Sequence, residues 1–563
     1  NLGIVYFSQG AYDKAIEAYQ QSLTLAHALK EPQWESLVLI DLGTAYHAAG
    51  EVAQALSFLQ RGLAIARSIQ DRQGEISALG NLGLVYYDQA DYTKAIEAHQ
   101  QSLAIARSTQ DRYAEGIALN NMGLALFRAG RLLPAEQTLQ ACIQVLEALR
   151  SQFGNHDAAK ISLFEQQLRT YRTLQQVLSA QQKIDAALEV SEQGRARAFV
   201  ELLSTRLGKE QSPIMPSGSS TIAAPTAEQI KQIAKTHNAT LVQYSIIYDA
   251  FKIGKKTEWK ESQLYIWVVA PNGTINFRTT DLKPLWQQQQ RSLADLVAQS
   301  REVIGARGRS DIGITLSPEL SQAQQQQQTQ HLQQWHELLI QPIAPLLPSD
   351  PNQRVIFIPQ GELFLVPFPA LTDAQGAALI EQHTILTAPS IQVLELTRQQ
   401  ADRRKAPRGK GALIVGNPEM PKVMFEKGEE AVQLSDLPGA RQEAIAIAKL
   451  FNTKAITGKQ ATEPTIVQQM PNARFIHLAT HGLLEDVKNW GMPGAIALAP
   501  SGNGQSGDGL LTANEILKMQ LQAELVVLSA CDTGRGRITG DGVIGLSRSL
   551  IVAGVPSVVV SLW

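Results

Sequence analysis

Two residues in the last fifth of the chain could do nucleophilic chemistry together, the imidazole of His481 and the thiol of Cys531. His481 stands in the segment HLATHG (residues 477–482), and Cys531 stands in LSACDTG (residues 528–534). A free thiol has a pKa of about 8.5, so little of it is the reactive thiolate at neutral pH. A neighbouring histidine can accept the thiol proton and later donate a proton to a leaving group. If the fold brings these two side chains together, they form a Cys–His dyad that can attack a carbonyl carbon.

Each candidate residue follows a short apolar run. Residues 525–528 (LVVL) precede Cys531, and residues 473–476 (ARFI) lead into the segment that ends at His481. Short apolar runs bounded by glycine and polar residues predict buried strands. In open α/β sheets, ligands bind at the carboxyl ends of the strands. The sequence therefore predicts that the thiol and the imidazole lie at one edge of a sheet, with the histidine 50 residues before the cysteine (531 − 481).

The surrounding sequence alternates between strand-like and helix-like segments. Strands are expected at 239–248, 263–269, 354–359 and 412–415, and helices at 437–451 and from about 542 to 552. This alternation predicts an α/β domain with a mainly parallel central sheet, which we place at residues 227–563. Residues 208–226 include a stretch rich in Ser, Pro, Gly and Ala and are expected to form a linker. Two glutamine-rich patches between residues 287 and 328 carry no assigned function.

The first 142 residues repeat with a period of 40. The tripeptides NLG, DLG, NLG and NMG begin at residues 1, 41, 81 and 121, and alanines recur at 15, 55, 95 and 135. Apolar residues in both arms have helical spacing. The pattern resembles the tetratricopeptide repeat, which usually has 34 residues, and we expect the six extra residues at the corners between repeats, near 68–72 and 108–112. Residues 143–207 keep a helical pattern without the period, which predicts a helical cap or extension. Together, the sequence predicts an all-α repeat solenoid followed by the α/β domain.

Composition excludes several classes of protein. The formal charge is −2, which gives no general attraction to nucleic acid or to an anionic membrane, and no apolar run reaches the roughly 20 residues that span a bilayer. The only cysteines, Cys142 and Cys531, lie in different segments, so we expect no disulfide framework, a reducing compartment and a cytoplasmic location. Cys142 lies among apolar residues of a repeat helix, which is typical of a core residue. No cofactor or metal is predicted.

Five segments together resemble a known family. They are VIFIPQGELFLVPF (355–368), LPGARQEA (437–444), HLATHG, LSACDTG and AGVPSVVVSLW (553–563). This set is similar to the CHAT domain, the caspase-like peptidase domain found attached to tetratricopeptide repeats. Caspases also place their histidine about 50 residues before the cysteine. The resemblance covers nearly the whole chain and implies a caspase-like α/β domain with His481 and Cys531 as the catalytic dyad.

The resemblance also implies an activity and partners. The expected reaction is the hydrolysis of peptide bonds, with the backbone N–H groups of Gly482 and Cys531 binding the oxyanion and Asp532 as a candidate for substrate contact. The expected partners are a protein or peptide substrate and a protein bound to the repeats, and the family architecture suggests a bacterial source. Because the chain begins inside a repeat at Asn1 and ends after an apolar run at Trp563, we expect a fragment at both ends, with residues that read the substrate side chain beyond Trp563.

Other interpretations remain open at this point. His477 and His481 are four residues apart, a zinc-binding spacing on a helix, but both are expected on a strand and its exit, so His477 is expected to be a core residue with a partner. The segment GRGRITGDG (534–542) could cradle a phosphate before a helix. The alternative function is a non-catalytic protein-interaction scaffold with a caspase-like docking domain.

Overall fold

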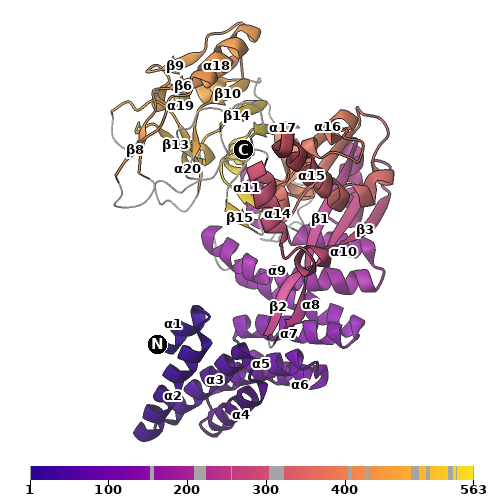
Figure 1. The fold of residues 1–563 in the computed structure, drawn as a ribbon, viewed down its shortest axis with the longest axis vertical. Coiled ribbons are helices and arrows are strands. Elements are labelled where there is room, and N and C mark those ends of the chain that lie inside the picture. The colour runs from indigo at the N-terminus through magenta and orange to yellow at the C-terminus, as the bar shows by residue number, and fades with distance from the viewer. Residues whose placement is uncertain are drawn as a thin grey trace. The chain divides into compact units, whose positions relative to one another are not determined.

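The protein is described here by a computed structural model of residues 1–563, shown in Figure 1. The structure describes residues 2–151, 157–207, 223–254, 256–303, 322–402, 409–424, 430–483, 493–502, 507–530, 537–539 and 542–561. The chain divides into two compact units. The first contains Asn1–Ser191 with Ile247–Ser262, and the second contains Glu192–Ile246 with Gln263–Trp563.

The first unit is built mainly from antiparallel helix pairs (Figure 1). The eight repeat helices are α1 (Leu2–Ser8), α2 (Tyr12–Leu29), α3 (Pro32–Ala49), α4 (Val52–Ser68), α5 (Arg72–Asp88), α6 (Tyr92–Ser108), α7 (Arg112–Arg128) and α8 (Leu132–Ser151). They are followed by α9 (Asp157–Ala180) and α10 (Ile184–Gln193). The predicted repeat solenoid is confirmed.

A glycine in the first helix of each pair explains the recurring tripeptides. A Cβ atom added at Gly43 would lie 2.5 Å from the side chain of Leu59, and one at Gly123 would lie 2.6 Å from Leu139. In the third repeat the corresponding atom at Gly83 would lie 2.4 Å from the ring of His99. Only a residue without a side chain lets the second helix of the pair pack this closely.

The extra residues of the 40-residue repeat lengthen the helices, so their expected place at the corners is wrong. Helices α5 and α6 each have 17 residues, and the corners between repeats, at 69–71 and 109–111, have only three residues each. Asp71 and Asp111 cap the helices that follow these corners, and Asp91 caps the second helix of the third repeat; each accepts a hydrogen bond from a backbone N–H of the first turn.

The second unit contains a five-stranded sheet in the order β3-β2-β1-β4-β5. Its strands are β1 (Ala239–Ile253), β2 (Lys256–Val269), β3 (Ile275–Asp281), β4 (Arg354–Ile358) and β5 (Thr384–Thr387). Strands β1, β4 and β5 run parallel, and β2 pairs with β3 antiparallel. The helical elements of this part are α11 (Arg197–Leu207), α12 (Ala227–His237), α13 (Lys283–Gln287), α14 (Leu293–Val303), α15 (Gln322–Leu339), η2 (Gln341–Leu346), η3 (Gly361–Leu365), η4 (Phe368–Ala370), α16 (Leu379–Gln382) and α17 (Ile391–Asp402).

A second five-stranded sheet has the order β17-β14-β10-β6-β9, and all its strand pairs are parallel. Its strands are β6 (Ala412–Pro418), β9 (Ile456–Gly458), β10 (Phe475–Ala479), β14 (Leu525–Ser529) and β17 (Ser557–Val560). The helical elements are α18 (Pro438–Leu450), α19 (Glu463–Gln469), η5 (Met470–Asn472), α20 (Ala513–Leu517) and α21 (Leu546–Ala553). The predicted α/β region with a mostly parallel sheet is confirmed.

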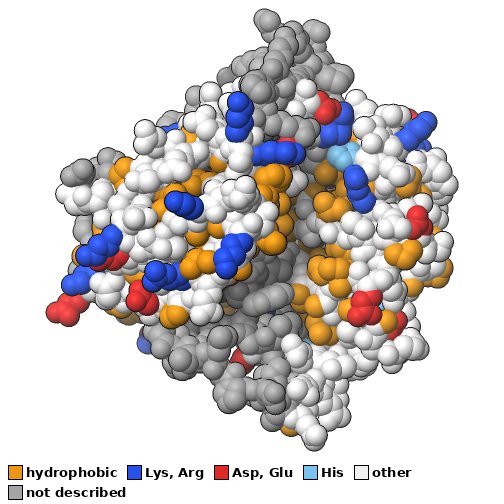
Figure 2. All heavy atoms as spheres, turned by 90° about the horizontal axis from the view of Figure 1, so that it is seen from above, with side chains coloured by type: hydrophobic (Ala, Val, Ile, Leu, Met, Phe, Trp, Pro, Cys, Tyr) orange, Lys and Arg blue, Asp and Glu red, His pale blue; other side chains and the backbone are white. Residues whose placement is uncertain are grey.

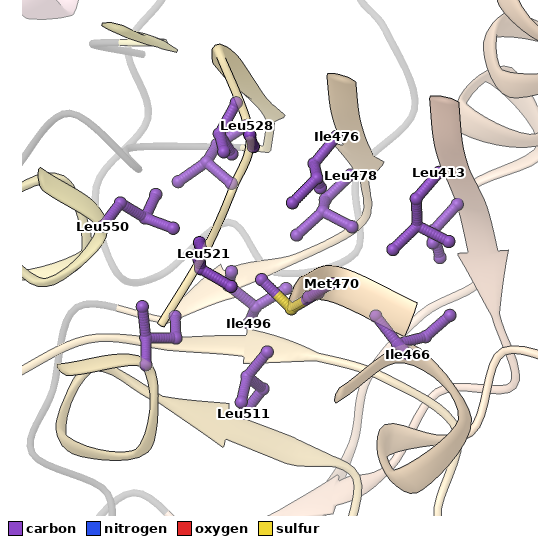
Figure 3. Packing of buried hydrophobic residues seen from close by; sticks show 14 of the residues in the cluster. Leu413, Ile466, Met470, Ile476, Leu478, Ile496, Leu511, Leu521, Leu528 and Leu550 are labelled. Carbon is purple, nitrogen blue, oxygen red and sulfur yellow. The ribbon is translucent and has the colours of Figure 1, made fainter. Parts of the chain in front are cut away.

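Helices cover both faces of this second sheet. On one face Ile476, Leu478 and Leu528 pack with Met470 and Leu550 in an apolar cluster (Figure 3). On the other face α18 packs on β6 through Ala444, next to Ile414. Because side chains alternate along a strand, residues 476 and 478 of β10 face one layer and residue 477 faces the other.

Small strand pairs complete the unit. Strands β11 (Gly482–Leu483), β12 (Ala495–Ala497) and β13 (Leu510–Thr512) form an antiparallel sheet, and β7 (Lys422–Val423) pairs with β8 (Val432–Gln433). Strand β15 (Arg537–Thr539) pairs with β16 (Gly542–Ile544).

Figure 2 shows one face of the molecule, where hydrophobic side chains gather along both sides of a hollow and Lys and Arg side chains lie scattered around it.

Candidate active site

The candidate site lies at the carboxyl ends of two neighbouring parallel strands. Strand β10 pairs with β14 in a register that joins Phe475 to Leu525 and Ala479 to Ser529. Both strands are central in the sheet order, because β6 flanks β10 and β17 flanks β14. His481 therefore comes two residues after the last pair on β10. Cys531 comes two residues after the last pair on β14 in sequence.

His481 is half-buried, and its ring is held by a backbone carbonyl. The Nε2 atom lies 2.8 Å from the carbonyl oxygen of Ser435, in the segment between β8 and α18. A carbonyl oxygen can only accept a hydrogen bond, so Nε2 carries the ring proton and donates it. In the neutral ring Nδ1 is then the nitrogen with a free electron pair, which is the form that a general base requires.

The neighbours of His481 in sequence fix its backbone. Thr480 is buried, and its hydroxyl donates to the Ala497 carbonyl at 2.8 Å, while the Ala497 amide donates to the His481 carbonyl at 3.0 Å. Gly482 faces Ile496 in the antiparallel pair of β11 with β12. Hydrogen-bonded and non-hydrogen-bonded pairs alternate in such a ladder, and the bond at His481 makes Gly482–Ile496 a non-hydrogen-bonded pair. The N–H of Gly482 thus points away from β12.

His477 lies on the opposite side of β10 from Ile476 and Leu478 and has its own partner. The side chain is buried, and its Nε2 atom lies 2.9 Å from Oε1 of Glu443 on α18. Burial lowers the pKa of His477, and the carboxylate of Glu443 opposes that shift. His477 is thus a buried residue with a partner, as the sequence predicted. Within the described ranges, no three His, Cys, Asp or Glu side chains form a group that could hold a metal ion.

Cys531 and Asp532 lie outside the described residues, so their pairing with His481 stays a prediction. The structure describes the residues immediately before them up to Ala530. The carbonyl of Ala530 accepts a hydrogen bond from the hydroxyl of Ser561, at the end of β17. This contact ties the end of β14 to the next strand of the sheet.

The glycine-rich segment after Cys531 differs from the phosphate loop considered above. The predicted helix is present as α21 (Leu546–Ala553), but it begins about four residues later than expected, because residues 542–544 form strand β16, paired with β15. Thr539 faces Gly542 across this hairpin. The described part of the segment is a strand pair, so it does not run directly into a helix N-terminus as a phosphate cradle requires.

The other cysteine has the surroundings of a core residue. Cys142 is completely buried, and its thiol donates to the carbonyl of Gly116 at 3.3 Å. Burial raises the pKa of this thiol to about 12. Cys142 is therefore a thiol that stays protonated at neutral pH, as predicted for a small core residue.

Comparison with known families identifies both parts of the chain. Residues 329–563 match the CHAT domain, and residues 1–68 and 74–148 match the tetratricopeptide repeat. The chain is a CHAT domain protein with N-terminal tetratricopeptide repeats. The predicted family is thereby confirmed, and the repeats belong to a class that mediates protein–protein interaction.

Two curated relatives share this length of sequence. Tetratricopeptide repeat protein 28 of Homo sapiens is 24% identical over 562 residues, covering 78% of this chain and 21% of that protein. The protein of the same name in Mus musculus is 23% identical over 563 residues, covering 78% of this chain and 22% of that protein. The chain thus spans about a fifth of the length of these relatives. Both come from mammals, and the bacterial source expected from the sequence stays a prediction.

Among solved structures, the apo form of RapI is 16% identical, covering 37% of this chain and 75% of that chain with a TM-score of 0.30. BtubC from P. vanneervenii is 18% identical, covering 40% of this chain and 85% of that chain, also with a TM-score of 0.30. Among the described residues, no helix is both long and apolar enough to cross a membrane.

Sequence reasoning missed the contacts that hold the candidate histidine. The contact with the Ser435 carbonyl cannot be recognised in a sequence motif, because every residue type has the same backbone oxygen. Thr480 was visible inside HLATHG, but its role depends on Ala497, which is 17 residues away in the chain. Such partners become visible only when β11 and β12 are paired.

Proposed function

We propose that this protein is a cysteine endopeptidase that uses a dyad of His481 and Cys531, with repeats that bind a protein partner or regulator. The observation that carries the proposal is the register of β10 and β14. Both candidate residues stand two positions after the pair Ala479–Ser529, at the carboxyl ends of strands that lie side by side. Neighbouring strands are about 4.8 Å apart, which is within reach of a thiol and an imidazole.

The chemistry follows from the state of the histidine. With its proton on Nε2, held by the Ser435 carbonyl, His481 takes the thiol proton of Cys531 at Nδ1. The thiolate attacks the carbonyl carbon of a peptide bond, and the protonated His481 donates its proton to the leaving amine. The acyl group on sulfur is then released by water. The N–H groups of Gly482 and Cys531 are the proposed donors to the oxyanion, and the N–H of Gly482 points away from β12 as such a role requires.

The remaining expectations complete the proposal. Residues 1–142 form the repeats, 143–207 a helical extension, 208–226 a linker and 227–563 the peptidase domain, with residues 208–222 of the linker outside the described residues. Asp532 is a candidate substrate contact. The protein works without a cofactor, in the cytoplasm, on a protein or peptide substrate. Neither nucleic acid nor membrane is a proposed partner.

The alkylation rate of the two cysteines tests the dyad. Wild type, His481→Ala and Cys531→Ala are treated with iodoacetamide at pH 6.5, and modified peptides are quantified by mass spectrometry. We expect Cys531 to react at least about tenfold faster in wild type than in His481→Ala, because the histidine raises the thiolate fraction. Cys142 is the internal reference, since its buried thiol has a pKa of about 12. Equal rates at Cys531 with and without His481 would rule out the dyad.

Cleavage is measured separately. A search for new protein N-termini in cells with the wild-type chain should give products that vanish with Cys531→Ala. The alternative function is a non-catalytic interaction scaffold, and it is favoured by the curated relatives, whose name refers to the repeats alone. A reactive Cys531 without any cleavage product would support that alternative.

A further inference from the structure

Strands β1 and β2 extend well beyond the sheet to which they belong. The pairing of β1 with β4 ends at Gln243, and the pairing of β2 with β3 begins at Gln263. Residues 247–253 of β1 and 256–262 of β2 form a two-stranded arm, which we call the hairpin tip, and they belong to the first unit. An isolated two-stranded ribbon is only marginally stable in water, so the hairpin tip needs contacts outside its own sheet.

Three arginines of the helical unit make those contacts. Arg128, on α7, bonds Asp249 at 2.8 Å, and its Nε atom donates to the hydroxyl of Tyr87. The guanidinium of Arg169, on α9, lies 3.7 Å from the ring centre of Trp259. Arg172, also on α9, lies 4.6 Å from the ring centre of Tyr248. We call Arg128, Arg169 and Arg172 the arginine face.

The arginine face lies on the first helices of successive pairs. A cavity of about 220 Å³ adjoins Arg169, lined by Trp259 and Thr257 of the hairpin tip and by side chains of α3, α5, α6, α7 and α9. His47 and Asp88 also line the cavity and pair with each other at 2.8 Å. The cavity therefore gives room for further side chains next to Trp259.

We propose that the arginine face is the recognition site for the protein partner, that the partner presents a segment with an aromatic ring and a carboxylate, and that the hairpin tip is the resident occupant of this site. The hairpin tip and the arginine face are chemically complementary. The occupant seen in the structure offers one carboxylate and two aromatic rings to three guanidinium groups, which is the chemistry that arginine binds by charge pairing and by stacking. This inference builds on the proposed binding role of the repeats.

The contacts of the hairpin tip suit an exchangeable occupant. The side chains of the Arg128–Asp249 pair are 28% and 24% exposed, and partly exposed ion pairs and cation–π contacts are individually weak. The hairpin tip is covalently attached, so its high effective concentration keeps it bound until a competitor of the same chemistry arrives. Its removal would release the end of β1, the strand whose first residues, Ala239–Gln243, pair with β4. Partner binding is thereby linked to the sheet that contains β1.

A competition experiment on the full chain tests this. The probe is a fluorescent synthetic peptide with the sequence of residues 247–262, and its binding is followed by fluorescence anisotropy. In wild type the peptide must displace the hairpin tip, whereas the double variant Asp249→Ala/Trp259→Ala lacks two of the three resident contacts. We expect the peptide to bind the double variant about tenfold or more tightly than wild type. Adding Arg169→Ala to the double variant should reverse the gain.

Two controls separate this result from unfolding and from peptidase activity. Lys252→Ala changes an exposed residue of the hairpin tip and should bind the peptide as wild type does. In wild type, hydrogen exchange of residues 247–262 should increase when the peptide is added, a measurement that needs no variant to fold. Equal affinity of wild type and double variant, or no binding to either, would overturn the proposal. The readout requires neither His481 nor Cys531, so it is independent of the peptidase proposal.

Discussion

Replacing His99 by leucine should remove a loss of stability that the third repeat otherwise shows at low pH. His99 is 1% exposed, packs on Gly83 and occupies the position that Leu59 and Leu139 fill in the second and fourth repeats. Its buried Nδ1 atom has no hydrogen-bond partner among the described residues. Burial lowers the pKa of His99 from 6.5 to about 4, because a protonated ring would be charged inside an apolar layer.

The sign and size of the effect follow from this pKa. Between pH 6.5 and 4 the unfolded chain binds a proton that the folded repeat does not, so the contribution to stability is complete above pH 6.5 and is lost as the pH falls. One pH unit in this window corresponds to about 1.4 kcal/mol, so wild type should lose about 2 kcal/mol at pH 5 relative to pH 8. His99→Leu should not show this loss and should stay within about 1.5 kcal/mol of wild type at pH 8.

Hydrogen exchange of the amides of α5 and α6, at pH 5 and pH 8 and corrected for intrinsic rates, measures the opening free energy of this repeat. His27→Gln is the control, because the side chain of His27 is 80% exposed. The cavity beside His99 also contains His47, Asp88 and Arg169, but their contributions cancel in the difference between wild type and variant. An equal loss of protection in wild type and His99→Leu on acidification would refute the reasoning.

Two further predictions concern packing and the candidate site. Gly83→Ala should destabilise the third repeat by roughly 1–3 kcal/mol, because its Cβ would meet the ring of His99. In the same helix the Cβ of Gly80→Ala would meet nothing within 4 Å, so this variant should stabilise the repeat by about 0.5–1 kcal/mol. Thermal unfolding measures both effects, and equal effects would contradict the packing argument. Thr480→Val should lower the free energy of unfolding by about 1–2 kcal/mol and slow the alkylation of Cys531, because the Ala497 carbonyl loses its buried donor. Thr480→Ser is the control, because it retains the hydroxyl. If the valine and serine variants behave alike, this hydrogen bond does not position His481.

The elements predicted from sequence are those whose pattern is local. The 40-residue period predicted the helix pairs, and apolar runs before His481 and Cys531 predicted β10 and β14. The left-handed backbone that ends the first helix of each pair occurs at Gly10, Gly50 and Gly130, and also at Ala90, which fills the equivalent position. Local chemistry of this kind is readable because each residue type has its own backbone preference.

The elements missed are those that depend on distant partners. Residues 249–262 are rich in charged side chains and were not expected to be strands, yet β1 and β2 continue through them because the ribbon pairs with itself and its aromatic rings meet arginines of α9. Arg195 and Arg197 carry a charge, which is typical of an exposed position, and their neighbours in the sequence do not predict burial. Both are buried, and Arg195 donates to the carbonyl of Pro359, 164 residues away. A local sequence pattern does not predict contacts between residues that are so far apart in the chain.

Whether His481 meets Cys531 stays a prediction, but the contact with Ser435 already limits how the histidine can work. The imidazole ring cannot flip and exchange the positions of Nδ1 and Nε2 without breaking the hydrogen bond from Nε2 to Ser435. Any hydrogen that His481 collects must therefore leave by the atom at which it arrived. If Nδ1 both accepts the thiol proton and later donates it to the leaving amine, the sulfur must move away from Nδ1 before the amine can take its place.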